Sequence, residues 1–216
     1  MNLLELKSLV HNATRNDVLL GVVPTLINQA IRYTEDLRSW SGMRVTNVFP
    51  APSSATQIVL PSNFKEPQGG NTPILVSSVD CAESEPWMFI SKQEMGKLKR
   101  IGTGTSDRKA FIDFENGGAP ILVFPGPVLV DTTVAFDYYQ YLPDLVLSTD
   151  HNWFTDRLPM LILWKAIALT FGLEQDQASQ QNVLTYDAKF DKEFTRAGNV
   201  DAIQERRGRS LRMGGV

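Results

Sequence analysis

The segment TTVAFDYYQYLPDLVLSTDHNWFTDRLPMLILWKAIALTF, residues 132–171, decides the fold because it joins the clearest strand of the chain to a strongly apolar helix. Residues 132–142 alternate in character, so that Val134, Phe136 and Tyr138 share one face of a strand. The sequence therefore predicts a long strand that leads into a helical C-terminal part.

The helix after this strand is predicted from its apolar pattern and its end signals. Thr149 or Asp150 is expected to cap it, and it extends to about Phe171, with Gly172 as its stop. Pro159 lies well inside this pattern and cannot donate a backbone hydrogen bond. The first turns are therefore expected to form a separate short helix.

Both ends of the chain have helical patterns. Residues 3–10 and 26–37 place apolar side chains at helical spacing, and Pro24 is expected in the first turn of the second of these helices. A last helix is expected to start at Asp176, and Gly198 is expected to end or kink it.

The middle of the chain is rich in short strands. Ser91 and Glu94 have the spacing of a capping box, which predicts a helix over residues 91–100. The Asn116–Gly117–Gly118 sequence between two apolar runs predicts a β-hairpin. The other expected strands are 43–49, 56–60, 74–79, 109–114 and 119–124.

This order of elements predicts an α+β fold, because a helix pair at each end encloses a run of strands. The two terminal helix pairs can form one helical bundle with a β-rich insertion between its halves. The expected division is N-terminal helices at 1–42, an inserted β-rich domain at 43–142, C-terminal helices at 143–200 and an extended basic tail at 201–216. The tail cannot bury much apolar surface by itself, so a partner is expected to order it.

Composition excludes several classes of protein. The 216 residues are 43% hydrophobic and 21% charged, with a net charge of −3, which is typical of a globular protein and shows no overall basic field for nucleic acid. The single cysteine, Cys81, cannot form an internal disulfide. No apolar run is long enough for a membrane span, and the first residues lack the order of a signal peptide, so a product made in the cytoplasm is expected.

No residue pattern indicates catalysis or a metal site, and no cofactor is expected. His11 and His151 lie far apart in polar breaks, where a surface role is the ordinary one. The carboxylates of Asp144, Asp150 and Asp156 do not have the spacing of a known metal loop. The chain is therefore predicted not to be an enzyme.

Two features favour contact with other proteins. Aromatic side chains at Tyr138, Tyr139, Trp153 and Phe154 stand among acidic residues, which favours core packing or a subunit contact over stacking on bases. The tail combines basic and apolar side chains, which favours a groove on a protein over DNA phosphates. The predicted docking residues are Ile203, Arg206, Arg207, Arg209, Leu211, Arg212 and Met213.

Four segments carry a resemblance to one family of proteins. They are LINQAIRYTEDLRSW at 26–40, LPSNF at 60–64, YYQYLPDLVLSTDHNWFTDRLPMLILWKAIA at 138–168 and RSLRM at 209–213. In this order they resemble the N-terminal helix, the L-P-x-D-F strand end (with Asn63 in place of Asp), the strand with its following helix, and the basic ending of the head-to-tail adaptor (connector) proteins of tailed bacteriophages, of the podovirus type.

This resemblance implies a structural virion protein of the neck. Such proteins assemble as a ring, typically a dodecamer, beneath the portal protein; the ring extends the channel for genomic DNA, which passes without sequence specificity, and carries the tail or nozzle proteins. The tail would reach into the portal. Two alternatives stay open: another neck or tail-tube subunit, and a nucleic-acid-binding module that acts through the basic tail.

Overall fold

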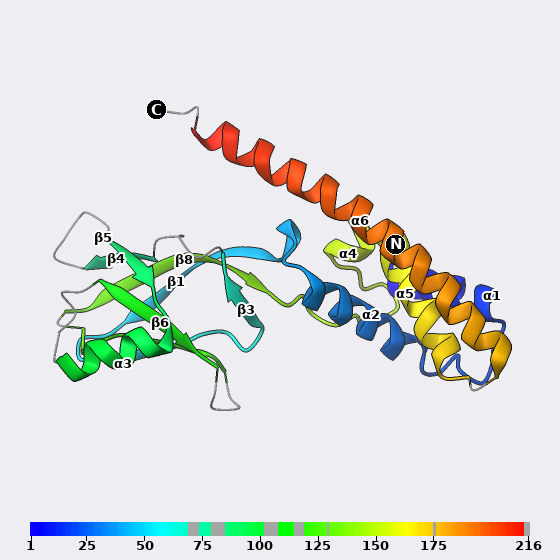
Figure 1. Cartoon of the computed structure of the whole chain (residues 1–216), viewed down its shortest axis with the longest axis horizontal. Coiled ribbons are helices and arrows are strands. Elements are labelled where there is room, and N and C mark those ends of the chain that lie inside the picture. Colours follow the sequence, from blue (N-terminus) through cyan, green and yellow to red (C-terminus); the bar gives the residue numbers. More distant parts are fainter. Residues whose placement is uncertain are drawn as a thin grey trace. The chain divides into compact units, whose positions relative to one another are not determined.

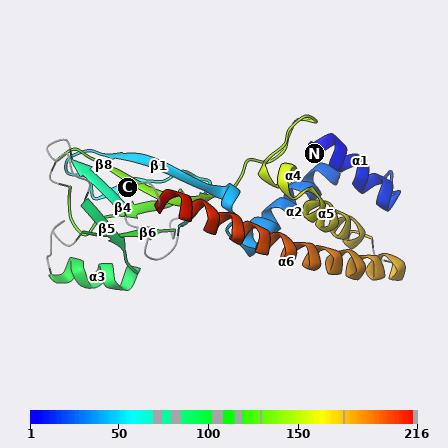
Figure 2. The same cartoon turned by 90° about the horizontal axis from the view of Figure 1, so that it is seen from above.

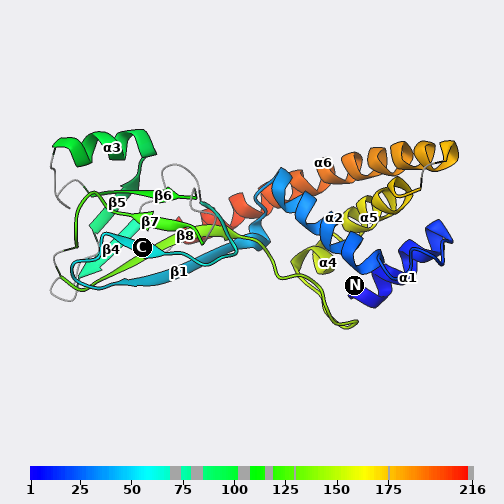
Figure 3. The ribbon, with the colours of Figure 1, turned by 90° about the horizontal axis from the view of Figure 1, so that it is seen from below.

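The computed structural model describes residues 1–68, 74–78, 85–101, 108–114, 119–128, 130–174 and 176–213; for residues 77, 78, 85, 99–101 and 205–213 it describes only the backbone. The chain forms two compact units, drawn in Figures 1–3. Residues 1–43 and 142–216 make the helical unit, and residues 44–141 make the β unit. The predicted α+β class is confirmed.

Helix α5 is the centre of the helical unit, because it contacts α1, α2, α4 and α6. It carries buried side chains on every side, from Leu161 to Phe171, as expected for a helix that is apolar all round. The helices of this unit are α1 (Leu3–Thr14), α2 (Val23–Leu37), α4 (Trp153–Arg157), α5 (Pro159–Gly172) and α6 (Gln177–Met213), with a short 3₁₀ turn, η1 (Ser41–Met43).

Strand β8 (Thr132–Gln140) organises the β unit, because it pairs with β1 and with both β3 and β4. The sheet order is β1-β8-β4-β5-β6-β7-β2, with β3 beside β8. The predicted hairpin is present as the antiparallel pair β6–β7, and its turn lies outside the described residues. The other strands are β1 (Arg44–Ala51), β2 (Gln57–Val59), β3 (Phe64–Pro67), β4 (Ile74–Ser78), β5 (Glu85–Phe89), β6 (Lys109–Asp113) and β7 (Ile121–Val123).

Helix α3 (Lys92–Ile101) connects β5 to β6, which pair in parallel. Parallel neighbours need a crossover of this kind, because a tight turn can join only antiparallel strands. The predicted capping box is confirmed: the Ser91 amide donates to Glu94 at 3.0 Å, and the Glu94 amide donates to the Ser91 hydroxyl at 3.3 Å. Figure 1 places α3 against the sheet at β6.

Three predictions about helix ends have different outcomes. Pro159 begins α5 and separates it from the short helix α4, as predicted. The cap at Thr149 or Asp150 was wrong, because the Asn152 side chain accepts from the amides of Phe154 and Thr155 instead. The alternative that Gly198 ends the last helix was also wrong, because α6 continues to Met213 as one helix of 37 residues. Within the described residues, no helix is both long enough and apolar enough to cross a membrane.

Candidate interaction sites

Asp201 ties α6 to the rest of the helical unit. Its carboxylate is only 3% exposed and accepts hydrogen bonds from the Ser41 amide, at 3.2 Å, and from the Ser41 hydroxyl. The guanidinium of Arg38 lies 3.7 Å away. A buried carboxylate needs such partners, so this cluster fixes the axial position of α6.

Aromatic contacts hold α6 before that anchor. The ring of Phe190 lies 5.7 Å from that of Tyr33, and the ring of Phe194 lies 5.5 Å from that of Trp40. Gly198 faces Arg38, and a β-carbon built at this position would lie 2.6 Å from the guanidinium. Glycine therefore leaves the space in which Arg38 crosses α6 toward Asp201.

Beyond Asp201 the backbone of α6 continues as a projecting helix. Residues 202–213 span about 18 Å at the rise of an α-helix. Figure 1 shows this end of α6 running past the other helices of the helical unit. Ile203 is 51% exposed. The backbone of residues 201–213 is helical, so the predicted extended tail was wrong. The predicted docking residues from Arg206 to Met213 lie on this helix.

The predicted aromatic contact residues are divided between the two units. Tyr138 is buried in the β unit, where its ring stacks on Phe64 at 5.0 Å, and Tyr139 is 8% exposed. Phe154 is fully buried in the helical unit, and its ring lies 5.2 Å from the half-buried ring of Trp153. Their burial indicates that these rings pack mainly inside their own units.

Gly42 has a packing role beside this cluster. The indole of Trp153 lies directly against it, and a β-carbon built at position 42 would overlap the ring. The same indole lies 6.1 Å from the buried ring of Trp40. Any larger side chain at position 42 would therefore displace Trp153 from the core.

Glu35 ties α2 to the segment that follows β8. Its buried carboxylate accepts from the Leu142 amide at 2.8 Å and from Arg32 at 2.9 Å, and Arg32 also reaches Asp144 at 3.0 Å. Burial raises the pKa of the Glu35 carboxyl, and the bonds from Leu142 and Arg32 oppose that shift. This network fixes the path of the chain where it enters the helical unit.

Asp150 shapes the turn at residues 146–150. Its carboxylate accepts from the amides of Val146 and Leu147, at 2.8 and 2.7 Å, and the Asp150 amide donates to the Leu147 carbonyl at 3.0 Å. The turn is joined to α1 by a bond of 3.0 Å from the Leu4 amide to the Ser148 carbonyl. The turn therefore leaves Val146 and Leu147 exposed to solvent, by 78% and 64%.

We expect the Asp150 carboxyl to titrate below its ordinary pKa of 3.8, because the two amide bonds favour the charged form. A lowered pKa in the folded state stabilises the turn above pH 3.8 and loses that effect as the pH falls through the folded value. NMR titration of the carboxyl carbon would measure the shift, and Asp150→Ala should speed amide hydrogen exchange at Val146 and Leu147. A pKa at or above the ordinary value would contradict the hydrogen bonds.

The two histidines lie beside different aspartates. His11 is 3.4 Å from Asp17, and His151 is 2.9 Å from Asp156. Across the part of the chain that the structure describes, no three His, Cys, Asp or Glu side chains gather as a metal site would require. Cys81 lies outside the described residues.

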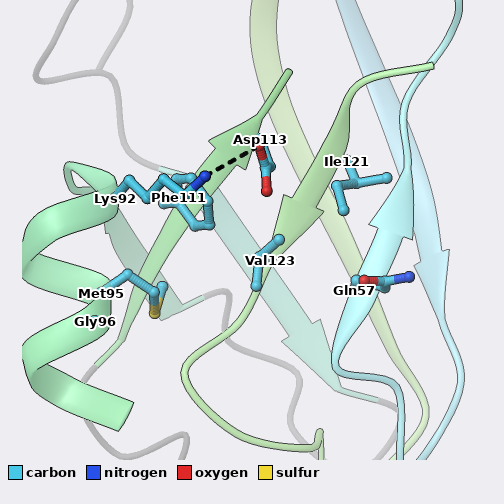
Figure 4. A pocket seen from close by; sticks show the side chains of 8 residues that line it. All are labelled: Gln57, Lys92, Met95, Gly96, Phe111, Asp113, Ile121 and Val123. Carbon is cyan, nitrogen blue, oxygen red and sulfur yellow. Dashed lines mark ion pairs between the residues drawn. The ribbon is translucent and has the colours of Figure 1, made fainter. Parts of the chain in front are cut away.

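A pocket of about 430 Å³ opens between α3 and the sheet of the β unit. Figure 4 shows Lys92, Met95 and Gly96 on its helix side, facing side chains from β6, β7 and β2. Met95, Phe111 and Val123 form a buried apolar floor, and Gln57, Lys92 and Asp113 add polar groups to the lining. On the rim, the Lys92 ammonium lies 3.9 Å from Asp113. We call this site the α3 pocket; its lining is completed by Gln57, Asp113 and Ile121.

The Asp201 anchor, the 146–150 turn and the α3 pocket were missed by sequence reasoning. The only signals were a lone acidic residue before an arginine-rich segment and a glycine inside an otherwise regular short helix. The Asp201 anchor and the α3 pocket depend on residues from distant parts of the chain, such as Ser41 with Asp201, and the turn depends on α1 for its position.

Comparison with known proteins assigns the family. A search of curated proteins found no match. The family model described as SU10 adaptor protein matches residues 1–214, which takes in both units and α6. The match therefore spans nearly the whole chain and agrees with the resemblance seen in the separate segments. The chain belongs to the SU10 adaptor protein family and is a structural adaptor protein of a phage.

Proposed function

We propose that this protein is the head-to-tail adaptor of its virion: copies form a ring in the neck, dock on the portal protein and carry the tail or nozzle proteins. Membership of the adaptor family over residues 1–214 supports this role. A ring, which we take to be a dodecamer, would extend the channel through which genomic DNA passes without sequence specificity.

The projecting end of α6 is the portal-docking segment in this proposal. The observation that carries it is the anchor at Asp201, because the helix is fixed up to that residue and then extends beyond the helices of its own unit. The helices from both ends of the chain would serve as the bundle that presents it. A helix whose sequence combines basic and apolar residues can enter a groove on a partner.

The chemistry of this segment fits a protein surface with acidic and apolar parts. Arg206, Arg207, Arg209 and Arg212 outnumber the single acidic residue, Glu205. Guanidinium groups form strong paired hydrogen bonds with carboxylates. Ile203, Leu211 and Met213 would enter apolar pockets, which DNA phosphates do not provide.

Deletion of residues 203–216 should abolish binding to the portal and leave the protein folded. The cut lies just after the Asp201 anchor, so the buried contacts of α6 that the structure describes are kept. Circular dichroism melting would test the fold, and mass photometry with the cognate portal ring would count the bound copies. The full chain should add to the ring in a fixed high copy number.

A matched control is the full-length variant in which the four segment arginines are replaced by lysine. It keeps the charge but loses the paired geometry of guanidinium, so it should bind the portal more weakly than the full chain. Undiminished portal binding by the folded deletion variant would refute docking through α6. Steep salt dependence of DNA binding by the isolated protein would instead favour the nucleic-acid alternative.

A further inference from the structure

Val146 and Leu147 are aliphatic side chains held in the open by a fixed turn. Two amide bonds to the Asp150 carboxylate define the turn, and the bond to Ser148 fixes it to α1. Leu4, at the start of α1, adds a third aliphatic side chain that is 55% exposed. Exposing such groups costs free energy unless a partner covers them.

The 146–147 turn protrudes, whereas the α3 pocket is a depression with an apolar floor. The floor of Met95, Phe111 and Val123 is open at Gly96, where an added β-carbon would meet no atom within 4 Å. A glycine within a helix is less favourable than an alanine, because it loses more backbone freedom on folding. The pocket therefore has room for aliphatic side chains that the chain itself does not supply there.

The charges around the two sites are also complementary. Helix α3 carries Lys92 and Lys97 against Glu94, whereas residues 142–157 carry Asp144, Asp150 and Asp156 against Arg157. The side chains of Lys92, Asp144 and Asp156 are 54%, 58% and 47% exposed. Opposite charges of this kind orient an encounter between two surfaces and favour one register.

We propose that the 146–147 turn of one copy inserts into the α3 pocket of the next copy, so that Val146 and Leu147 lie against the half-buried Ile121 and the open face of Gly96. A protruding turn and a pocket at different places on the same chain make a head-to-tail contact. Such contacts generate a ring when the rotations between successive copies add up to a full turn. This contact rests on the proposed ring function. It would join neighbouring copies through the turn of one copy and the α3 pocket of the next.

Disulfide trapping tests the contact directly. In a Cys81→Ser background, a Leu147→Cys chain is mixed with a Gly96→Cys chain and oxidised, with and without the portal ring. The heterodimer should form in several-fold higher yield than with a Val18→Cys chain, whose parent side chain is 91% exposed in the same unit. Equal yields from the two mixtures in both conditions would overturn the proposal.

Ring filling on the portal is the second test. Val146→Ser/Leu147→Ser and Gly96→Leu, which fills the pocket, should each raise the concentration that half-fills the portal ring by about tenfold, equivalent to the loss of one well-buried aliphatic contact. Val18→Ser is the control, because this side chain is 91% exposed and belongs to neither the turn nor the pocket, and it should fill the ring like the parent chain. Unchanged filling by both the turn variant and Gly96→Leu would also overturn the proposal.

The two proposals fail in different ways. If residues 203–216 do not dock on the portal, their deletion leaves portal binding intact while the disulfide test still reports the contact between copies. If the turn does not enter the pocket, the deletion abolishes portal binding while the turn and pocket variants fill the ring normally.

Discussion

Replacing Trp40 with alanine is expected to lower the free energy of unfolding by about 3–5 kcal/mol, the usual cost of removing a large aromatic side chain from a core. Trp40 is completely buried, and its ring packs on Phe154 at 5.8 Å and on Phe194 at 5.5 Å. Its indole N–H donates to the Thr34 carbonyl at 3.1 Å, and the truncation would leave that acceptor buried without this donor. Urea unfolding followed by circular dichroism would measure the loss.

Val18→Ala is the control for Trp40→Ala, because this side chain is 91% exposed in the same unit and its truncation should change stability by less than about 0.5 kcal/mol. Trp40→Phe keeps part of the packing and should fall between the two. A loss below about 1 kcal/mol for Trp40→Ala would mean that these rings do not form the core of the helical unit.

Phe136→Ala should destabilise the β unit by about 3–5 kcal/mol. Phe136 is 3% exposed on β8, and its ring lies 5.4 Å from that of Phe49, 5.5 Å from that of Phe89 and 5.7 Å from that of Tyr138. It therefore joins three strands, and no single neighbour can fill the space it leaves. Urea unfolding monitored by near-ultraviolet circular dichroism would detect the loss of aromatic packing.

Val48→Ala on β1 is the control for Phe136→Ala, since Val48 is 56% exposed and should tolerate truncation. Phe136→Leu keeps most of the buried volume and should cost about 1.5 kcal/mol or less. Equal free energies of unfolding for Phe136→Ala and Val48→Ala would show that Phe136 does not lie at the centre of the core of the β unit.

Local patterns predicted those elements whose signals lie within a few residues. The alternation in residues 132–142 gave β8, and Ser91 with Glu94 gave the start of α3. Asp176 was correctly expected to start the last helix, because its carboxylate accepts from the Ser179 amide at 2.8 Å. In each case the bond or face that defines the element involves only near neighbours in sequence.

Elements that depend on distant partners were missed. Strand β5 contains Pro86 and no clear alternation, and its place comes from pairing with β4 and with β6. Asp150 looked like a helix cap, but the amides that its carboxylate satisfies are those of Val146 and Leu147. An aspartate can accept hydrogen bonds from backbone amides either at the start of a helix or in a turn. The packing of the turn against α1 selects the turn for Asp150.

The continuity of α6 was hidden by its glycines. Each glycine costs about 1 kcal/mol within a helix, so Gly198 and Gly208 favoured an earlier end. The buried Ala197 and the anchored Asp201 on either side of Gly198 offset its cost. The docking residues themselves were chosen from composition and from the family resemblance, and their role stays a prediction.

A continuous α6 also has a mechanical consequence. A helix of 37 residues is about 55 Å long and resists bending, so it acts as a stiff lever with its fulcrum at Asp201. A load on its free end would be carried as torque to the Arg38, Ser41 and Asp201 cluster and to the rings of Trp40 and Phe194 beside it. The emission of Trp40 should therefore report strain applied at the far end of the helix.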